Sequence, residues 1–139
     1  MILVDTNVVS EPLRPRGDPR VPDWLDRQIP RTLYISTISV AEILFGVRSL
    51  PAGKRRAALA TAIEREVQRL FAGRVVPFDL AAARAYAALM SGARAKGATI
   101  SILDGQIAAI AAANGFDVAT RDEAPFRVAG LKTINPWTE

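Results

Sequence analysis

Ile2-Leu3-Val4-Asp5-Thr6-Asn7, at the start of the chain, is the stretch that decides the fold. A short apolar run followed at once by helix-capping side chains is typical of a buried strand that leads directly into a helix. Such strands belong to parallel sheets, where helices cover both faces. The stretch therefore predicts an α/β fold, with Asp5 at the carboxyl end of the first strand.

The rest of the chain alternates between strand and helix patterns. Thr37 or Ser39 is available to cap the helix after the second strand, and Asn114-Gly115 is a strong stop for the last long helix. We expect one domain, residues 1–139, with a central, mostly parallel five-stranded sheet and helices on both faces, a three-layer sandwich. Beyond the first strand, β-branched and aromatic runs predict strands at 33–36, 74–78, 116–120 and 131–135, and apolar periodicity predicts helices at 21–28, 39–47, 54–71, 79–96 and 102–114, with one further helical turn in 121–129.

The composition excludes several classes of enzyme. The chain has no Cys and no His, so disulfides, thiolate nucleophiles, histidine-dependent triads and nearly all zinc hydrolases are ruled out. The net charge of +4 favours a polyanionic partner only weakly. The start of the chain lacks the apolar stretch of a signal peptide, and no apolar run is long enough to span a bilayer, so we expect a cytoplasmic protein without a membrane role.

Four acidic residues fall where a site is expected. In an open parallel sheet, ligands gather beyond the carboxyl ends of the strands. Asp5 directly follows the first strand, Asp122 comes shortly after the strand that ends at Thr120, and Glu42 lies in the first turns of the helix after the second strand. Asp104 lies in the first turn of a strongly apolar helix, whose N-terminus we expect at the same end of the sheet.

Each acid taken singly has a structural explanation, since Asp5 can cap a helix and Asp104 can complement a helix dipole. Four acids that converge are harder to explain in this way, because crowded carboxylates repel one another unless a cation neutralises them. Carboxylate oxygens without imidazole or thiolate suit Mg²⁺ or Mn²⁺, which also bind phosphate oxygens. The pattern indicates metal-dependent hydrolysis of a phosphodiester.

Basic and aromatic residues fit this hypothesis without carrying it. We expect Arg121 either to contact phosphate beside Asp122 or to form an ion pair that holds the acids in position. The four large aromatic residues Trp24, Tyr34, Tyr86 and Trp137 are expected in the core or in a lid rather than in a base-stacking platform. Other bases that could contact phosphate, or simply form solvated surface, are Arg14, Arg16, Arg20, Arg48, Lys54, Arg55 and Arg56.

The chain resembles PIN-domain proteins of the VapC toxin type, close to the FitB-like subgroup, over essentially its whole length. The resemblance rests on five segments in order: Met1-Ile2-Leu3-Val4-Asp5-Thr6-Asn7 with Ser10-Glu11-Pro12-Leu13-Arg14, then Ser39-Val40-Ala41-Glu42-Ile43, Asp104-Gly105-Gln106-Ile107-Ala108-Ala109, Ala119-Thr120-Arg121-Asp122 and Ile134-Asn135-Pro136-Trp137. It implies a PIN-like fold and a Mg²⁺- or Mn²⁺-dependent endoribonuclease. In that family pattern Asp5, Glu42, Asp104 and Asp122 hold the metal and are the catalytic residues.

The resemblance also bears on neighbouring positions and on partners. Many family members have Asn at the position of Asp122 and an acid a few residues later, where this chain has Pro125-Phe126. Thr6, Asn7 and Thr120 match polar positions beside the family's acids, and they could equally serve as caps and turn formers. Further implications are an RNA substrate, a cognate antitoxin protein and a homodimer, and an exposed apolar stripe on helix 54–71 is one expected place for partner contact.

Two other functions are compatible with parts of the pattern. One is a non-catalytic binding module with a PIN-like fold, whose acids hold a metal structurally or not at all. The other is a phosphate-transfer enzyme with Asp5 as nucleophile. The second needs an acid at position 7, which is Asn, and a well-placed Lys near the late strands, so we disfavour it.

Overall fold

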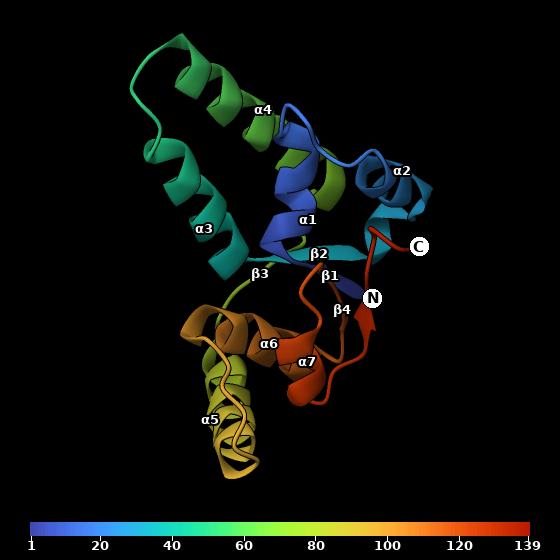
Figure 1. Ribbon diagram of the computed structural model, residues 1–139, viewed down its shortest axis with the longest axis vertical. Helices are drawn as coiled ribbons and strands as arrows, with labels where there is room; N and C mark the ends of the chain where they lie inside the picture. The colour runs from blue at the N-terminus through green and yellow to red at the C-terminus, as the bar shows by residue number, and fades with distance from the viewer.

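A five-stranded sheet forms the centre of the molecule in the computed structural model, which describes all 139 residues (Figure 1). The strand order is β3-β2-β1-β4-β5 and every neighbouring pair is parallel. The sheet is thus wholly parallel, which agrees with the predicted fold class. The strands are β1 (Ile2–Val4), β2 (Leu33–Ser36), β3 (Val75–Val76), β4 (Asp117–Ala119) and β5 (Thr133–Ile134).

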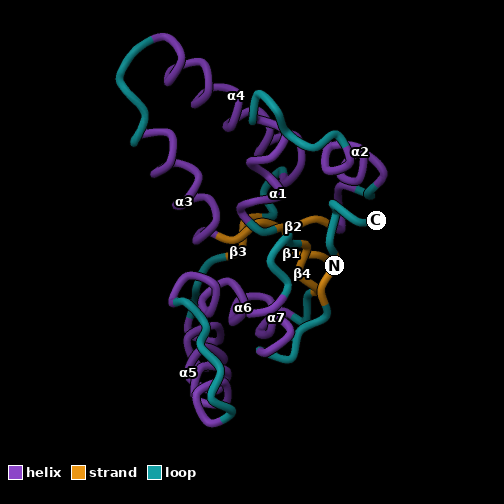
Figure 2. The backbone as a smooth tube through the Cα atoms, in the orientation of Figure 1, coloured by secondary structure: helices purple, strands orange, loops and turns teal.

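Helices cover the sheet on both faces, as Figure 2 shows for the purple helices on either side of the orange strands. In the view of Figure 1, α1 to α4 lie on one side of the sheet and α5 to α7 on the other. The helices are α1 (Thr6–Ser10), α2 (Arg20–Arg27), α3 (Thr37–Arg48), α4 (Lys54–Phe71), α5 (Leu80–Ala95), α6 (Ile102–Asn114) and α7 (Ala124–Val128), with 3-10 turns η1 (Glu11–Leu13) and η2 (Pro30–Thr32).

Alternation along the strands divides the core into two layers. In β1, Val4 faces the cluster under α1 to α4, and Leu3 faces the cluster under α6 and α7. The same alternation places Ile35 in the first cluster and Tyr34 against the second. Burial on both faces explains why these strands are apolar throughout, as predicted from the first stretch of sequence.

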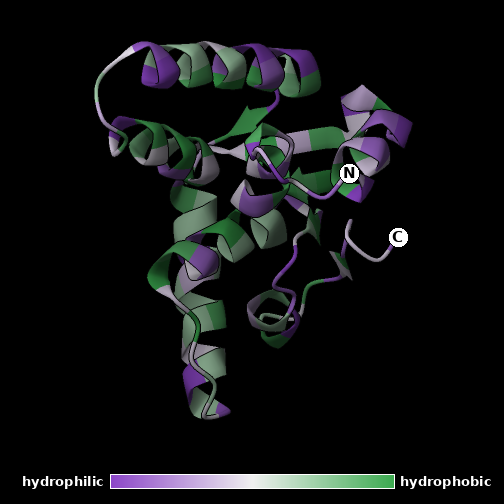
Figure 3. Cartoon of the chain, turned by 45° about the horizontal axis from the view of Figure 1, so that its top comes forward, coloured by the Kyte–Doolittle hydropathy of each residue, from purple (hydrophilic) through white to green (hydrophobic).

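Two expectations about the helices need correction. The cap of α3 is Ser36, whose side chain accepts from the backbone N–H of Ser39, because β2 runs up to this residue and the helix starts directly after it. The apolar stripe of α4 is mostly not exposed: Ile63, Leu70 and Phe71 are buried in the core. Hydrophilic and hydrophobic segments alternate along α4 in Figure 3 because only its sheet-facing stripe is apolar.

The ends of the helices follow the residue types expected there. Asp79 caps α5 and Ser101 caps α6 through their side chains. Gly115 ends α6 in the left-handed conformation, with φ of 68°, as the Asn-Gly pair predicted. No helix combines the length and the apolar composition needed to cross a membrane.

Candidate active site

Asp5 lies at the carboxyl end of β1, in the middle of the sheet. Its backbone N–H donates to the carbonyl of Ala119 over 2.9 Å, which extends the β1–β4 ladder up to the acid. Its side chain also serves as the cap of α1 by accepting from the backbone N–H of Thr6 over 2.8 Å. The capping explanation for Asp5 is therefore correct as far as it goes, although it accounts for only one carboxylate oxygen.

The second oxygen of Asp5 accepts hydrogen bonds from two side chains. Thr120 Oγ1 donates to Oδ2 over 2.8 Å, and Asn7 Nδ2 approaches the same atom at 3.3 Å. Asn7 in turn accepts from the backbone N–H of Arg121 over 3.3 Å. The polar residues at positions 6, 7 and 120 thus surround the carboxylate of Asp5, beyond any role as turn formers.

The carboxyl group of Asp5 is strongly perturbed. Burial raises its pKa from 3.8 to about 6, and the negative charges of Asp104 and Glu42 act in the same direction. The hydrogen bonds from Thr120 and Thr6 oppose this rise by stabilising the charged form. Acids with such shifts are uncommon outside functional sites, since a fold gains nothing from burying a carboxylate near two others.

Glu42 lies in the second turn of α3 and is half-buried. Its Oε1 accepts a hydrogen bond from Thr6 Oγ1 over 2.9 Å. Thr6 therefore joins two of the predicted acids, because its backbone N–H donates to Asp5 while its hydroxyl donates to Glu42.

Asp104 lies in the first turn of α6, where its backbone N–H donates to the cap residue Ser101. Its side chain makes no hydrogen bond or ion pair within the chain, and its charge contributes to the raised pKa of Asp5. The close approach of α6 to α5 helps to place it. A Cβ at the next residue, Gly105, would lie 2.7 Å from Met90 Sδ, so only glycine fits without a shift.

Asp122 differs from the other three acids. It is exposed in the turn between β4 and α7 and makes no hydrogen bond within the chain. The carboxylate of the neighbouring Glu123 is already hydrogen-bonded within the chain. It accepts hydrogen bonds from Arg127 and Thr133, and Asn135 Nδ2 approaches it at 3.5 Å. No three acidic side chains stand together as a ready-made metal cage.

Comparison with known proteins assigns the chain to a family. The model of the PIN domain matches residues 2–131. The chain belongs to the PIN-domain family. It is 53% identical over 137 residues to the VapC ribonuclease Y4jK of Sinorhizobium fredii, with 99% of this chain and 98% of that protein covered. It is 46% identical to the toxin FitB of Neisseria gonorrhoeae, with 99% of each chain covered.

A solved structure supports the same assignment. The crystal structure of FitAcB from Neisseria gonorrhoeae superposes with a TM-score of 0.95 and 45% sequence identity, and the match covers 100% of both chains. The predicted resemblance to VapC-type and FitB-like PIN proteins is therefore confirmed.

Six arginines of this PIN domain line two separate hollows. Arg14, Arg16, Arg20 and Arg121 line one open hollow, while Arg48 and Arg56 line another between α3 and α4. Arg121 does not form the ion pair that was one of the two expectations for it. Its guanidinium lies 5.4 Å from the ring centre of Trp137, a cation–π contact.

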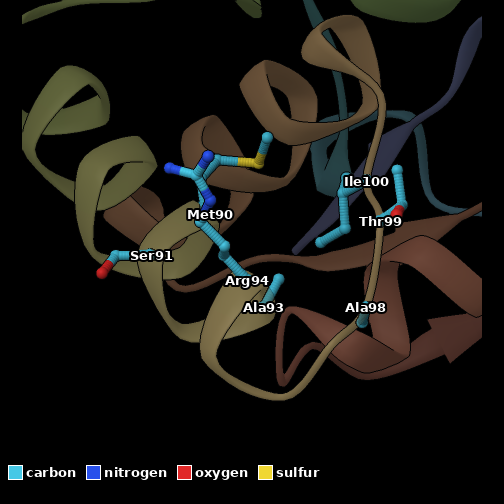
Figure 4. A pocket seen from close by; sticks show the side chains of 7 residues that line it. All are labelled: Met90, Ser91, Ala93, Arg94, Ala98, Thr99 and Ile100. Carbon is cyan, nitrogen blue, oxygen red and sulfur yellow. The ribbon is translucent and has the colours of Figure 1, made fainter.

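Two further hollows differ in chemistry. A hollow of about 460 Å³ at the end of α5, drawn in Figure 4, is lined mainly by small and apolar residues with Arg94 as its only charge, and it lacks the groups for phosphodiester chemistry. A groove of about 290 Å³ has Thr6 and Glu42 in its lining and is otherwise largely apolar. Its remaining lining residues are Ser10, Leu13, Arg14, Ile43, Gly46, Val47, Leu59 and Ile63.

Proposed function

We propose that this PIN domain is a metal-dependent endoribonuclease that hydrolyses RNA phosphodiester bonds and acts as the toxin of a type II toxin–antitoxin pair. The observation that carries the proposal is the environment of Asp5. A buried carboxylate with a pKa of about 6 lies near the charges of Asp104 and Glu42 and is held in place by Thr120 and Thr6. The names of the similar VapC ribonuclease and FitB toxin point to the same activity.

The donor atoms fit a hard divalent cation, Mg²⁺ or Mn²⁺. They are carboxylate oxygens, with no imidazole or thiolate anywhere in the chain. Repulsion among Asp5, Glu42 and Asp104 is of the kind that a bound cation relieves. Mg²⁺ typically uses one or two protein carboxylates together with waters and substrate phosphate oxygens, so a cage of three acids is not required.

In this proposal Asp5 and Asp104 hold the cation, with Glu42 and Asp122 completing the acidic set. The cation would activate water and stabilise charge on the phosphodiester during hydrolysis. The chain's own hydroxyls have a positioning role: Thr120 and Thr6 orient the two oxygens of Asp5, and Thr6 also orients Glu42. By favouring the ionised carboxylate, these hydrogen bonds keep Asp5 available as a ligand near neutral pH.

The proposal includes a cognate antitoxin as protein partner. The groove beside Thr6 and Glu42 is open and mostly apolar, so a segment of antitoxin bound there would reach the acids. We also propose a homodimer, since large apolar side chains are exposed at the starts of α5 and α6, notably Leu80 and Ile102 at 65% and 66%. The proposed site of action is the cytoplasm, where cellular RNA is the substrate.

Cleavage of a mixed pool of structured RNAs tests the nuclease function. The purified protein is assayed with Mn²⁺, with Mg²⁺ and with EDTA, beside Asp5→Asn and the control Asp23→Asn, which alters an exposed acid of α2. We expect metal-dependent cleavage that Asp5→Asn abolishes and Asp23→Asn retains. Equal cleavage by Asp5→Asn would refute the assignment, and a folded, antitoxin-free protein inactive under every condition would favour the non-catalytic binding module.

A further inference from the structure

The hollow formed by the loop after η1, the start of α2 and the C-terminal segment is the second polar feature beside the acids. It has a volume of about 720 Å³ and is lined by four arginines, Arg14, Arg16, Arg20 and Arg121, with Trp137 as its only apolar residue. We name it the arginine hollow. Such a concentration of guanidinium groups favours a phosphate or carboxylate ligand.

Two of the four arginines are already paired inside the hollow. Arg20 binds Asp18 through Nε and Nη2, with a shortest distance of 2.6 Å, and these bonds lower the pKa of Asp18 to about 2. Arg14 lies 3.6 Å from Glu11, whose other oxygen accepts from the backbone N–H of Asp18. The two acids of the hollow are therefore already engaged by chain partners.

Arg16 and Arg121 have no carboxylate within salt-bridge distance. Arg16 is exposed, and Arg121 lies over the ring of Trp137, which holds its guanidinium at the wall of the hollow. Neither guanidinium forms an ion pair: that of Arg121 is held over Trp137 and acts on Asp18 only at longer range, where its charge helps to lower the pKa of that acid, and that of Arg16 extends into solvent. A cation at an aromatic face remains free to bind an anion through its N–H groups.

Trp137 is only 6% exposed, so its ring is held by packing and gives Arg121 a fixed surface at the edge of the hollow.

The arginine hollow adjoins the acids along the chain and in space. Arg121 directly follows Thr120, which binds Asp5, and its backbone N–H donates to Asn7, which also contacts Asp5. On the other side, Arg14 lines both the hollow and the groove that contains Thr6 and Glu42. A nucleic acid strand with one phosphate at Asp5 would thus pass over this hollow.

We propose that the arginine hollow binds a backbone phosphate of the RNA strand next to the scissile bond, with Arg16 and Arg121 as the contacting residues. This inference rests on the proposed ribonuclease function. In this inference the two arginines position the RNA strand so that its scissile phosphate lies at the acidic residues. A phosphate is favoured over a protein carboxylate because the hollow is wide and its lining is more polar than apolar, with four guanidinium groups and Trp137 as its one large apolar side chain.

Salt dependence of RNA binding tests the proposal independently of cleavage. A fluorescein-labelled single-stranded RNA is titrated with protein in EDTA between 50 and 200 mM salt, and binding is read by fluorescence anisotropy. For Arg16→Gln/Arg121→Gln we expect weaker binding and a plot of log K against log [salt] that is shallower by about 0.7 for each lost contact. The matched control is Arg31→Gln/Arg65→Gln, which removes two exposed charges outside the hollow, one in η2 and one in α4, and should leave the slope near that of the parent.

An unchanged slope, or the same change in the control pair, would overturn the proposal. Arg16→Gln alone guards against misfolding, because this exposed side chain makes no hydrogen bond or ion pair within the fold, and it should account for about half of the change in slope. Loss of antitoxin binding in the double variant with RNA binding intact would also overturn the proposal and assign the hollow to the protein partner. RNA binding that depends on the two arginines, in a protein that cleaves no RNA in the separate assay with Mn²⁺ or Mg²⁺, would contradict the ribonuclease function alone. The two failures are therefore distinguishable.

Discussion

Thr120 donates a hydrogen bond to Asp5 over 2.8 Å, although 115 residues separate the two along the chain. The pairing of β1 with β4 brings them together, since Val4 lies beside Ala119 in the register and the next residue of each strand enters the site. Thr120 is fully buried, so its hydroxyl acts on the carboxylate without competition from water.

Replacing Thr120 with Val should raise the pKa of Asp5 further. The parent value is about 6, and the Thr120 hydroxyl is the largest influence that lowers it. A hydrogen bond to a charged group contributes about 1.5–3 kcal/mol, so its loss should raise the pKa by about one unit or more. Carboxyl carbon NMR of the metal-free protein measures the titration. Thr120→Ser, which keeps the hydroxyl, should titrate like the parent, and a pKa unchanged in Thr120→Val would contradict the role assigned to this bond.

Asp5→Asn should stabilise the metal-free protein at pH 8. The folded-state pKa of about 6 exceeds the ordinary 3.8, so the folded chain retains a proton that the unfolded chain has released, and stability falls as the pH rises between these values. Above about pH 6 the parent protein has lost on the order of 3 kcal/mol of its free energy of unfolding, at about 1.36 kcal/mol per pKa unit. The Asp5→Asn protein does not lose this stability, because Asn carries no charge.

Urea unfolding in EDTA at pH 4 and pH 8 checks this prediction. The stability gain of Asp5→Asn over the parent should be larger at pH 8 and small at pH 4. Asp18→Asn should change stability at pH 8 in the opposite direction and destabilise the protein. The carboxyl of Asp18 has a lowered pKa, so its charged form stabilises the folded state. An Asp5→Asn protein with no advantage at pH 8 would argue against a perturbed carboxyl at this position.

Gly105→Ala should destabilise the fold and disturb the site together. The added methyl would lie 2.7 Å from Met90 Sδ and 3.1 Å from Tyr86 Cε2, where α6 packs on α5. Met90 Sδ lies near the end of a flexible, half-buried side chain, so the overpacking cost is at the low end of about 1–3 kcal/mol and is partly offset by the helical Gly→Ala gain of about 0.4–1 kcal/mol. Gly92→Ala is the matched control, because nothing lies within 4 Å of a Cβ there and a helical Gly→Ala change stabilises by about 0.4–1 kcal/mol. Thermal unfolding compares the two, and equal stability of both variants would refute the packing argument.

Asp122→Asn should have a milder effect on cleavage than Asp104→Asn. Asp122 is exposed and has no part in the perturbation of Asp5, whereas the charge of Asp104 contributes to it. We expect Asp104→Asn to abolish cleavage at any Mn²⁺ concentration and Asp122→Asn to require a several-fold higher concentration for the same rate. Cleavage rates measured across a Mn²⁺ titration decide the point. A complete loss of cleavage in Asp122→Asn would give this residue the same rank as Asp5 and Asp104.

The sequence by itself determined the order of elements and the position of the acids along the chain. An apolar run such as Ile2-Leu3-Val4 predicts a strand buried on both faces because neither face of the strand tolerates a polar residue. Helical periodicity predicted α4 and α6 to the residue, since spacing and end signals such as Gly115 are local properties. Together with the geometry of parallel sheets, these patterns placed Asp5 and Glu42 at one end of the sheet.

Only the tertiary structure decided what the side chains contact. The hydrogen bonds of Thr6 and Thr120 to Glu42 and Asp5 join residues 36 and 115 positions apart, and no local pattern encodes such pairs. The same holds for Arg121, which stacks on Trp137 instead of pairing with an acid, and for the stripe of α4, which is buried. The raised pKa of Asp5 has this origin too, because burial is a property of the packed chain and its local sequence carries no measure of it.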